Sequence, residues 1–249
     1  MQAIILAAGI GNRLGMLGNR PKSLLEFGGQ SLLARHLSIL HANGISRVTI
    51  CVGYCAEQIR AAADSSPIPV EFVVNGDYRR GSVVSLWHAR AALALDEPVL
   101  LMDADVLYHP KMIRRLVESR HTHCFLLDRE FVPGDEPVKL CVREGRLVEF
   151  RKKPDPSIAF DLCGESVGFF KFGPACAHEL ATRCDAYIRE DRLDAPYEEP
   201  IRDLIQATRL PLGFEDITGV PWIEIDFPED VERARDTILP QLGTSSCKN

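Results

Sequence analysis

AIILAAGIG, residues 3–11, is the stretch that decides the fold. Residues 3–7 form an uninterrupted apolar run, which is typical of a strand buried on both faces. The run leads into Gly9 and Gly11, and a glycine-rich turn after a buried strand presents backbone N–H groups that hold phosphate. Glycine also lets the backbone approach a ligand closely. This start predicts an α/β protein with an anion site at the end of its first strand.

Strand-like and helix-like stretches alternate through the first half of the chain. A helix expected at Leu32–Ala42 ends at Asn43-Gly44, a common C-terminal signal. Such alternation predicts a Rossmann-like three-layer sandwich, in which a mostly parallel sheet carries helices on both faces. The other expected strands are 47–52, 70–74 and 99–102, and the other expected helices are 57–63 and 82–95.

The pattern changes after about residue 128. Two strand-like stretches flank Glu144-Gly145, which predicts a hairpin. We expect one domain over 1–240, made of halves 1–128 and 129–240, with the second half forming a small lid-like portion and a frayed tail at 241–249. The further expected strands are 138–142, 147–151, 166–172 and 222–226, and the further helices are 175–190, 200–207 and 229–239.

The composition is that of a soluble globular enzyme. It is 46% hydrophobic and 26% charged, which excludes a disordered, collagen-like or fibrous chain. The net charge of −6 gives no general attraction to nucleic acid or anionic membranes, so we expect neither as a partner. The start lacks the basic segment of a signal peptide, and the eight cysteines are scattered without a CxxC pair. We therefore expect a cytoplasmic protein with reduced thiols.

Two familiar phosphate-binding motifs fail on spacing. The dinucleotide fingerprint requires a glycine where Leu14 stands, and a P-loop requires a glycine before its lysine, whereas Lys22 follows Pro21. A plain tight turn would explain the glycines alone. However, Arg13 and Lys22 place two cations near the loop, and Pro21 stiffens the approach of Lys22. The two cations therefore favour an anion site over a plain turn.

The combination of LAAGIGNRL at 6–14 and PKSLL at 21–25 resembles the nucleotidyltransferase superfamily that activates sugar phosphates and related phosphate esters. The resemblance extends over roughly residues 1–236. It implies that Arg13 and Lys22 are catalytic residues that neutralise the triphosphate of a nucleotide. The residues that it assigns to the nucleotide-binding loop are Leu6, Ala7, Ala8, Gly9 and Gly11.

Two acidic residues, Asp103 and Asp105, directly follow a buried strand. Carboxylates at the carboxyl end of a strand lie where ligands usually bind in α/β sheets, and their oxygens suit Mg²⁺. Their alternative role is to cap the strand and the helix that follows Pro110. The resemblance implies that Asp105 holds Mg²⁺ as a catalytic residue, with Asp103 beside it at the nucleotide. It also implies a second metal ligand, Asp226, from the late segment WIEIDFPED at 222–230.

A helix start at Arg80-Gly81-Ser82 is the expected nucleobase site. The resemblance implies that Gly81 and Ser82 contact the base and that Asn75 lies beside them. The stretch 78–90 is most similar to the cytidylyltransferase branch that handles phosphocholine and 2-aminoethylphosphonate. That branch often carries Asn-Asn just before this helix, whereas this chain has Gly81-Ser82, so the resemblance defines the reaction better than the acceptor.

The second half of the chain is expected to bind the acceptor. Glu165 is placed on an acceptor-side strand, and Tyr197 and Glu198 belong to an acidic and aromatic segment that suits an amine or a quaternary ammonium group. Lys153 is expected to meet the acceptor's phosphate. The segment 194–199 has a plainer alternative as a solvated acidic helix start. Lys153 has one as an exposed lysine of the hairpin.

These observations predict a Mg²⁺-dependent cytidylyltransferase. It would transfer CMP from CTP to a small phosphate or phosphonate acceptor of the phosphocholine or 2-aminoethylphosphonate type and release pyrophosphate. One alternative is a nucleotidyltransferase for a sugar 1-phosphate or inositol 1-phosphate. Another is a catalytically silent nucleotide-binding regulatory module, against which the presence of both Asp105 and Asp226 argues.

Overall fold

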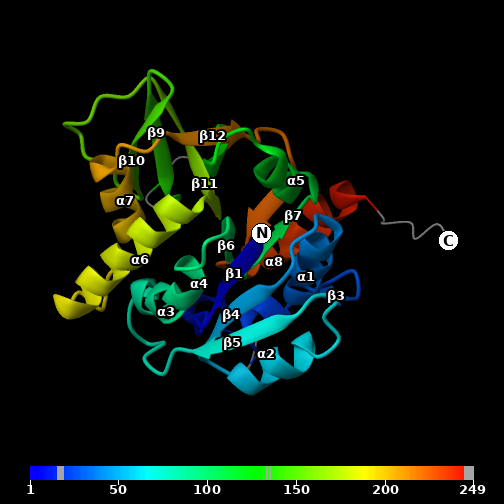
Figure 1. Ribbon diagram of the computed structural model, residues 1–249. Helices are drawn as coiled ribbons and strands as arrows, with labels where there is room; N and C mark the ends of the chain where they lie inside the picture. The colour runs from blue at the N-terminus through cyan, green and yellow to red at the C-terminus, as the bar shows by residue number, and fades with distance from the viewer. Residues whose placement is uncertain (16–19, 133, 135, 244–249) are drawn as a thin grey trace.

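A nine-stranded sheet forms the centre of the molecule (Figure 1). The computed structural model describes residues 1–15, 20–132, 134 and 136–243. The strand order is β10-β9-β11-β6-β1-β4-β5, and β8 joins β11 and β12 beside this path. The strands are β1 (Gln2–Ala7), β4 (Val48–Val52), β5 (Val70–Val74), β6 (Val99–Asp103), β8 (His123–Asp128), β9 (Lys139–Arg143), β10 (Arg146–Arg151), β11 (Leu162–Phe172) and β12 (Leu212–Asp216).

The expected α/β class is confirmed, with a sheet that is mixed. The glycine-loop strand β1 lies between β4 and β6 and is parallel to both, and β5 continues the parallel part. Beyond β6, the strand β11 runs antiparallel to β6, β8 and β9. Because the parallel strands share a direction, the carboxyl ends of β1 and β6 meet at one edge of the sheet, where ligands usually bind.

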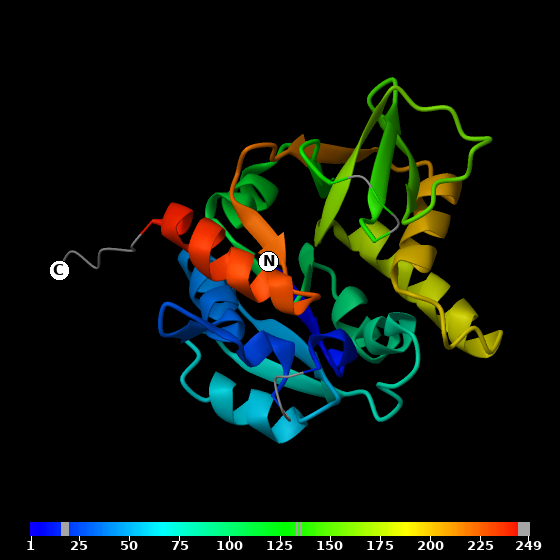
Figure 2. The same ribbon diagram turned by 180° about the vertical axis from the view of Figure 1, so that it is seen from behind.

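Helices cover both faces of the sheet, as the continuous apolar run of β1 predicts (Figures 1 and 2). Ala3 and Ile5 pack on the face that carries α1 (Leu32–Ala42), α2 (Ala56–Ala63) and α5 (Lys111–Glu118). Ile4 points to the opposite face, because successive side chains of a strand alternate. The helices on that face are α3 (Ser82–His88), α4 (Arg90–Leu93), α6 (Pro174–Arg189) and α7 (Glu198–Ala207).

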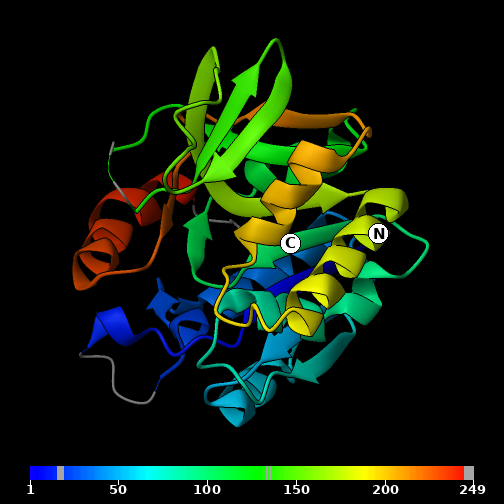
Figure 3. The same ribbon diagram turned by 90° about the vertical axis from the view of Figure 1, so that its left-hand side faces the viewer.

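The hairpin β9–β10 stands over α7 (Figure 3). Its turn is at Glu144 and Gly145, both with positive φ, as expected for a tight hairpin. Arg202 of α7 donates two hydrogen bonds, of 2.5 and 2.8 Å, to the fully buried carboxylate of Glu149 in β10. This paired charge fixes α7 to the hairpin, so the residues just before α7 are held against the sheet.

Several short elements lie beside the glycine loop and pack with the C-terminal helical segment (Figure 2). The C-terminal helical segment packs on Leu25, Phe27 and Leu107 in a third apolar cluster. The strand β13 pairs antiparallel with β7. These elements are η1 (Asn12–Leu14), η2 (Lys22–Leu24), β2 (Glu26–Phe27), β3 (Gln30–Ser31), β7 (Val106–Tyr108), β13 (Trp222–Glu224), α8 (Pro228–Arg233), the π-helical η3 (Ala234–Ile238) and η4 (Leu239–Leu242).

Several expected elements differ in the structure. The single helix expected at 82–95 is two helices, α3 and α4, and Arg90 donates its side-chain hydrogen bond to the Trp87 carbonyl at the break. The strand expected at 222–226 ends at Glu224, and the expected final helix is divided into α8, η3 and η4. The frayed tail expected from residue 241 is wrong for Leu242, which is buried in η4, while 244–249 lie outside the described residues.

Two further findings concern the whole described chain. Within the described part of the chain, no helix combines the length and the apolar character needed to cross a bilayer. Among the described residues, Cys51, Cys124, Cys141, Cys176 and Cys184 are buried and form no disulfide bond.

Candidate active site

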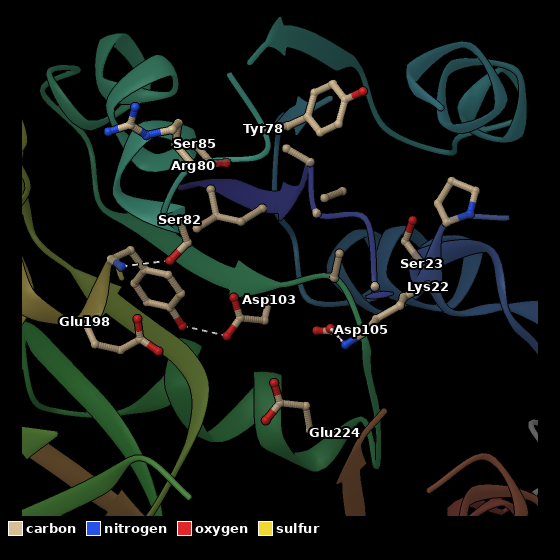
Figure 4. A pocket seen from close by; sticks show the side chains of 18 residues that line it. Lys22, Ser23, Tyr78, Arg80, Ser82, Ser85, Asp103, Asp105, Glu198 and Glu224 are labelled. Carbon is tan, nitrogen blue, oxygen red and sulfur yellow. Dashed lines mark hydrogen bonds and ion pairs between the residues drawn. The ribbon is translucent and has the colours of Figure 1, made fainter. Parts of the chain in front are cut away.

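A pocket lies at the carboxyl ends of β1 and β6, where the glycine loop, α3 and the start of α7 converge (Figure 4). The expected loop residues form one wall, and acidic residues form the other. Ser82 and Ser85 of α3 lie between the two walls. The lining residues are Leu6, Ala7, Ala8, Gly9, Gly11, Pro21, Lys22, Ser23, Tyr78, Arg80, Ser82, Ser85, Asp103, Ala104, Asp105, Tyr197, Glu198 and Glu224.

Lys22 is the central cation of this pocket. Its Nζ donates hydrogen bonds to Asp105 at 3.0 Å and to Asp226 at 2.6 Å. Burial alone would lower the pKa of the Lys22 ammonium, but the two carboxylates raise this pKa above its ordinary value. Gly11 has a φ of +70°, and a Cβ there would lie 2.9 Å from Cγ of Lys22, so glycine allows the lysine to pass directly under the loop.

Three carboxylates gather around the Lys22 ammonium. Oxygen atoms of Asp105, Glu224 and Asp226 all lie within 4.8 Å of one another. The pairing of β13 with β7 brings them together, because the Ile225 amide donates a 3.0 Å hydrogen bond to the Asp105 carbonyl. Burial, followed by Asp105 and Asp226, raises the pKa of Glu224. A set of hard oxygen ligands at this spacing fits Mg²⁺.

Glu224 is a site residue that the sequence reasoning missed. It lies two residues before Asp226, and the residues i and i+2 of an extended segment point to one side. The alternation in Trp222-Ile223-Glu224-Ile225-Asp226 was therefore the available signal.

Asp103 lies beside this cluster and is held by Tyr197. The Tyr197 hydroxyl donates a 2.6 Å hydrogen bond to Asp103, and the Tyr197 amide donates a 2.8 Å hydrogen bond to the hydroxyl of Ser82. Burial and the neighbouring Asp105 raise the pKa of Asp103 well above its usual range. Tyr197 thus joins the start of α7 to both β6 and α3.

Gly168 allows Asp103 to occupy this position. The residue has a φ of +75° at an irregularity of β11, and a Cβ built on it would overlap with Oδ2 of Asp103. Gly145 has nearly the same φ, +74°, but a Cβ there meets nothing within 4 Å. An alanine at either position would carry the backbone strain of a left-handed conformation. Only an alanine at position 168 would also overlap with Asp103.

We expect Gly168→Ala to lower the free energy of unfolding more than Gly145→Ala does. The shared backbone strain costs about 1 kcal/mol, and the overlap with Asp103 adds about 1–3 kcal/mol. Chemical denaturation of both variants measures the difference. Equal losses in the two variants would show that Asp103 moves aside freely and is not held in place.

Arg13 lies at the outer side of the carboxylate cluster and does not line the pocket described above, which we call the first pocket. Its guanidinium pairs with Asp226 at 3.3 Å and Glu136 at 3.1 Å, and it lies 5.4 Å from the ring centre of Phe227. The structure therefore brings together Arg13 and Lys22, the cations expected from the sequence, and Asp105 and Asp226, the expected metal ligands.

Of the three residues expected at the nucleobase, only Ser82 lines the pocket. Ser82 lines the pocket, whereas Gly81 packs so closely on the Asp194–Ala195 backbone that a Cβ would overlap with it. Asn75 is buried outside the pocket, and its side chain donates to the Ser85 hydroxyl at 3.0 Å. Asn75 therefore fixes Ser85, which does line the pocket and which sequence reasoning missed.

The four expected acceptor residues are not gathered in one place. Tyr197 and Glu198 line the first pocket, and Lys153 lies outside both pockets. Glu165 lines a second pocket that adjoins the first at Glu224 and also includes Asp226. Burial and the facing Asp128 raise the pKa of Glu165 to about 7. The carboxylate cluster thus forms the boundary between two pockets.

His36 of α1 supports the loop that carries the acidic residues, and sequence reasoning missed it. Its Nε2 lies 3.2 Å from the Ala104 carbonyl, and its Nδ1 lies 3.2 Å from the Tyr108 hydroxyl. Burial lowers the pKa of His36 to about 4, so the ring is neutral. Because a carbonyl only accepts, Nε2 donates to Ala104 and Nδ1 accepts from Tyr108. A histidine within the apolar stripe of α1 was the available signal.

Comparison with known sequences identifies one family. The sequence profile of the MobA-like NTP transferase domain matches residues 3–147. The chain is 30% identical over 244 residues to the bifunctional IPC transferase and DIPP synthase of Rubrobacter xylanophilus, covering 95% of this chain and 52% of that protein. It is 27% identical over 250 residues to the CMP-5'-(3-aminopropyl)phosphonate synthase of Streptomyces rubellomurinus, covering 94% of this chain and 38% of that protein.

The chain thus spans about half or less of the length of these two curated relatives. Among solved structures, the CTP:phosphocholine cytidylyltransferase LicC of Streptococcus pneumoniae is similar in fold. Its TM-score is 0.74 at 23% identity, and the match covers 93% of this chain and 96% of that one. The likeness extends over nearly the whole of both chains and includes both halves of the sheet.

Proposed function

Because the chain belongs to the MobA-like NTP transferase family, we propose that it is a Mg²⁺-dependent cytidylyltransferase. It transfers CMP from CTP to a small phosphate or phosphonate acceptor of the phosphocholine or 2-aminoethylphosphonate type and releases pyrophosphate. The observation that carries the proposal is the contact of Lys22 with two of three clustered carboxylates at the end of the glycine loop.

The nucleotide is assigned to the glycine-loop wall of the first pocket. The backbone of residues 6–11 faces the phosphates, and the positive charges of Lys22 and Arg13 offset the charge that builds on pyrophosphate as it leaves. Ser82 and Ser85 lie on the side where the base binds. With the phosphates at the glycine loop, the reacting phosphate is assigned to the space between this loop and the carboxylate cluster.

The transfer needs no side-chain general base. An oxygen of the acceptor's phosphate or phosphonate is already ionised at neutral pH, so it attacks the α-phosphorus of CTP in line. One P–O bond forms to the acceptor, and the bond to pyrophosphate breaks. Asp105, Glu224 and Asp226 would hold Mg²⁺, which supplies positive charge to the oxygens of the phosphorus centre. The protein's contribution is therefore orientation of the two substrates and fixed charge.

The activities after which the relatives are named support a CTP-dependent reaction and a phosphorus-containing acceptor. One relative makes a CMP-aminopropylphosphonate, and the similar fold of LicC belongs to an enzyme that uses CTP and phosphocholine. The acidic wall formed by Asp103, Glu198 and Glu224 agrees with an acceptor that carries a positive charge. An inositol or sugar phosphate could donate hydroxyl hydrogen bonds to this wall, but it carries no positive charge to pair with it.

Pyrophosphate release tests the proposal. Each of the four NTPs is combined with phosphocholine, 2-aminoethylphosphonate, inositol 1-phosphate and glucose 1-phosphate in the presence of Mg²⁺. We expect release with CTP and an amine-bearing acceptor, and loss of release with EDTA. Release with inositol or glucose phosphate alone would move the protein to that acceptor class. Nucleotide binding without release from any pair would favour the regulatory alternative.

A further inference from the structure

One carboxylate oxygen of the first pocket is buried and has no hydrogen-bond partner among the residues that the structure describes. This atom is Oε2 of Glu198, the first residue of α7. The side chain lines the pocket, and Figure 4 shows its carboxylate on the same side as Asp103 and Glu224. A buried acceptor atom with no donor among the described residues is costly to maintain, so it indicates a ligand that brings a donor.

The cations near Glu198 are already paired with other carboxylates. Lys22 binds Asp105 and Asp226 at the opposite end of the acidic wall. Arg80 is paired with Asp194 at 2.7 Å. Lys152, whose charge reaches Glu198, is bound to Glu136 at 3.1 Å. Burial raises the pKa of Glu198, so a positively charged ligand that enters the pocket here would stabilise the ionised form of this carboxyl group.

The pocket does not offer an aromatic box near Glu198. Its two aromatic residues are Tyr78 and Tyr197. Tyr197 is 6% exposed and uses its hydroxyl on Asp103, so little of its ring is accessible to a ligand. Figure 4 shows Tyr78 on the opposite side of the pocket from Glu198. A quaternary ammonium group has no N–H to donate and is usually bound by the faces of aromatic rings. Neither Tyr78 nor Tyr197 offers such a face near Glu198.

We infer that the acceptor carries a primary ammonium group and that Glu198 receives a hydrogen bond from it. This inference rests on the proposed cytidylyl transfer and narrows its acceptor to small aminoalkyl phosphates or phosphonates. The N–H donors of the ammonium group satisfy Oε2 of Glu198 in a charge-assisted hydrogen bond. Methyl groups in place of those hydrogens remove the donors and leave Oε2 unsatisfied.

A methylation series tests the inference on the unaltered protein. The acceptors are 2-aminoethylphosphonate and its mono-, di- and trimethylammonium analogues, together with phosphoethanolamine and phosphocholine. We expect kcat/KM to fall along each series, by about 100-fold from the primary amine to the trimethylammonium acceptor. An equal or higher kcat/KM for the trimethylated acceptors would overturn the inference and leave cytidylyl transfer intact. Release with none of these acceptors would instead contradict the proposed function.

The variant Glu198→Gln identifies the residue responsible. We expect kcat/KM for the primary amine to fall by about 100-fold, mainly through the acceptor KM, with much smaller losses for the trimethylated acceptor. The KM for CTP should stay within about twofold of the wild-type value, because Glu198 is assigned to the acceptor. Equal losses for all acceptors, or a matching rise in the KM for CTP, would show that Glu198 serves another role.

The control variant is Glu57→Gln on α2. The Glu57 side chain is 91% exposed and pairs with Arg60 outside both pockets, so the same chemical change there should leave all kinetic constants unaltered. Thermal melting of both variants checks that each is folded. If Glu198→Gln does not fold, the methylation series still decides the inference.

Discussion

Asp105→Asn is expected to lower kcat/KM for cytidylyl transfer by about 1,000-fold or more. The Asp105 carboxylate binds Lys22 at 3.0 Å and shares a 4.8 Å cluster with Glu224 and Asp226. An amide keeps the size of the side chain but removes a negative ligand from the proposed Mg²⁺ site. Because Asp226 still binds Lys22 at 2.6 Å, the lysine keeps a partner and the fold should persist.

The measurement is single-turnover CMP transfer at saturating and subsaturating Mg²⁺, with circular dichroism to confirm the fold. Asp64→Asn provides the control, because Asp64 is an exposed acid at the end of α2 and lines neither pocket. We expect the control to retain activity within a few-fold of the wild type. Full activity of Asp105→Asn would refute the metal assignment, and equal losses in the two variants would indicate a general effect of charge.

Lys22→Ala should have opposite effects on catalysis and on metal binding. Transfer should fall by about 100- to 1,000-fold, because the charge that offsets the developing negative charge on pyrophosphate is lost. Binding of Mg²⁺ or Mn²⁺ without nucleotide should become tighter, because the Lys22 ammonium competes for Asp105 and Asp226. Without metal, the three clustered carboxylates repel one another, so the variant should be less stable and should regain stability when metal is added.

Calorimetric titration measures metal binding, and thermal melting with and without metal measures stability. Pyrophosphate release measures the transfer reaction. Lys111→Ala, on an exposed position of α5, removes an equal charge from the protein outside the pockets. The interpretation fails if metal binds the Lys22 variant more weakly than the wild type, because the ammonium would then assist the metal site. Unchanged kinetics would remove Lys22 from catalysis.

The elements that sequence reasoning predicts well are those set by local patterns. The strand at residues 2–7 and the helix Leu32–Ala42 follow from an apolar run and from a helical stripe that stops at Asn43-Gly44. The hairpin turn at Glu144-Gly145 follows from the same kind of local signal. The break between α3 and α4 was not predictable, because it depends on one side chain, Arg90, that takes up the Trp87 carbonyl.

The pairing of β13 with β7 shows what local patterns leave out. Asp226 was identified through a motif, but Glu224 was not, because the alternation that puts both on one side of the segment does not show which other carboxylates that side faces. Only the contact between Ile225 and Asp105, residues 120 positions apart in the chain, places Glu224 beside the other two carboxylates. Long-range hydrogen bonds of this kind are decided by how the sheet packs.

By itself, the sequence determined the α/β class, the strand-to-glycine-loop start and the chemical type of the residues that converge on it, because these depend on periodicity and on residues close together in the chain. Only the tertiary structure decided how the expected acceptor residues are distributed, with Tyr197 and Glu198 in the first pocket and Glu165 in the second. It also decided that Tyr197 holds Asp103 and that Oε2 of Glu198 has no hydrogen-bond partner within the described part of the chain. The physical reason is that burial and pairing of polar groups depend on which distant segments meet, and no local pattern contains that information.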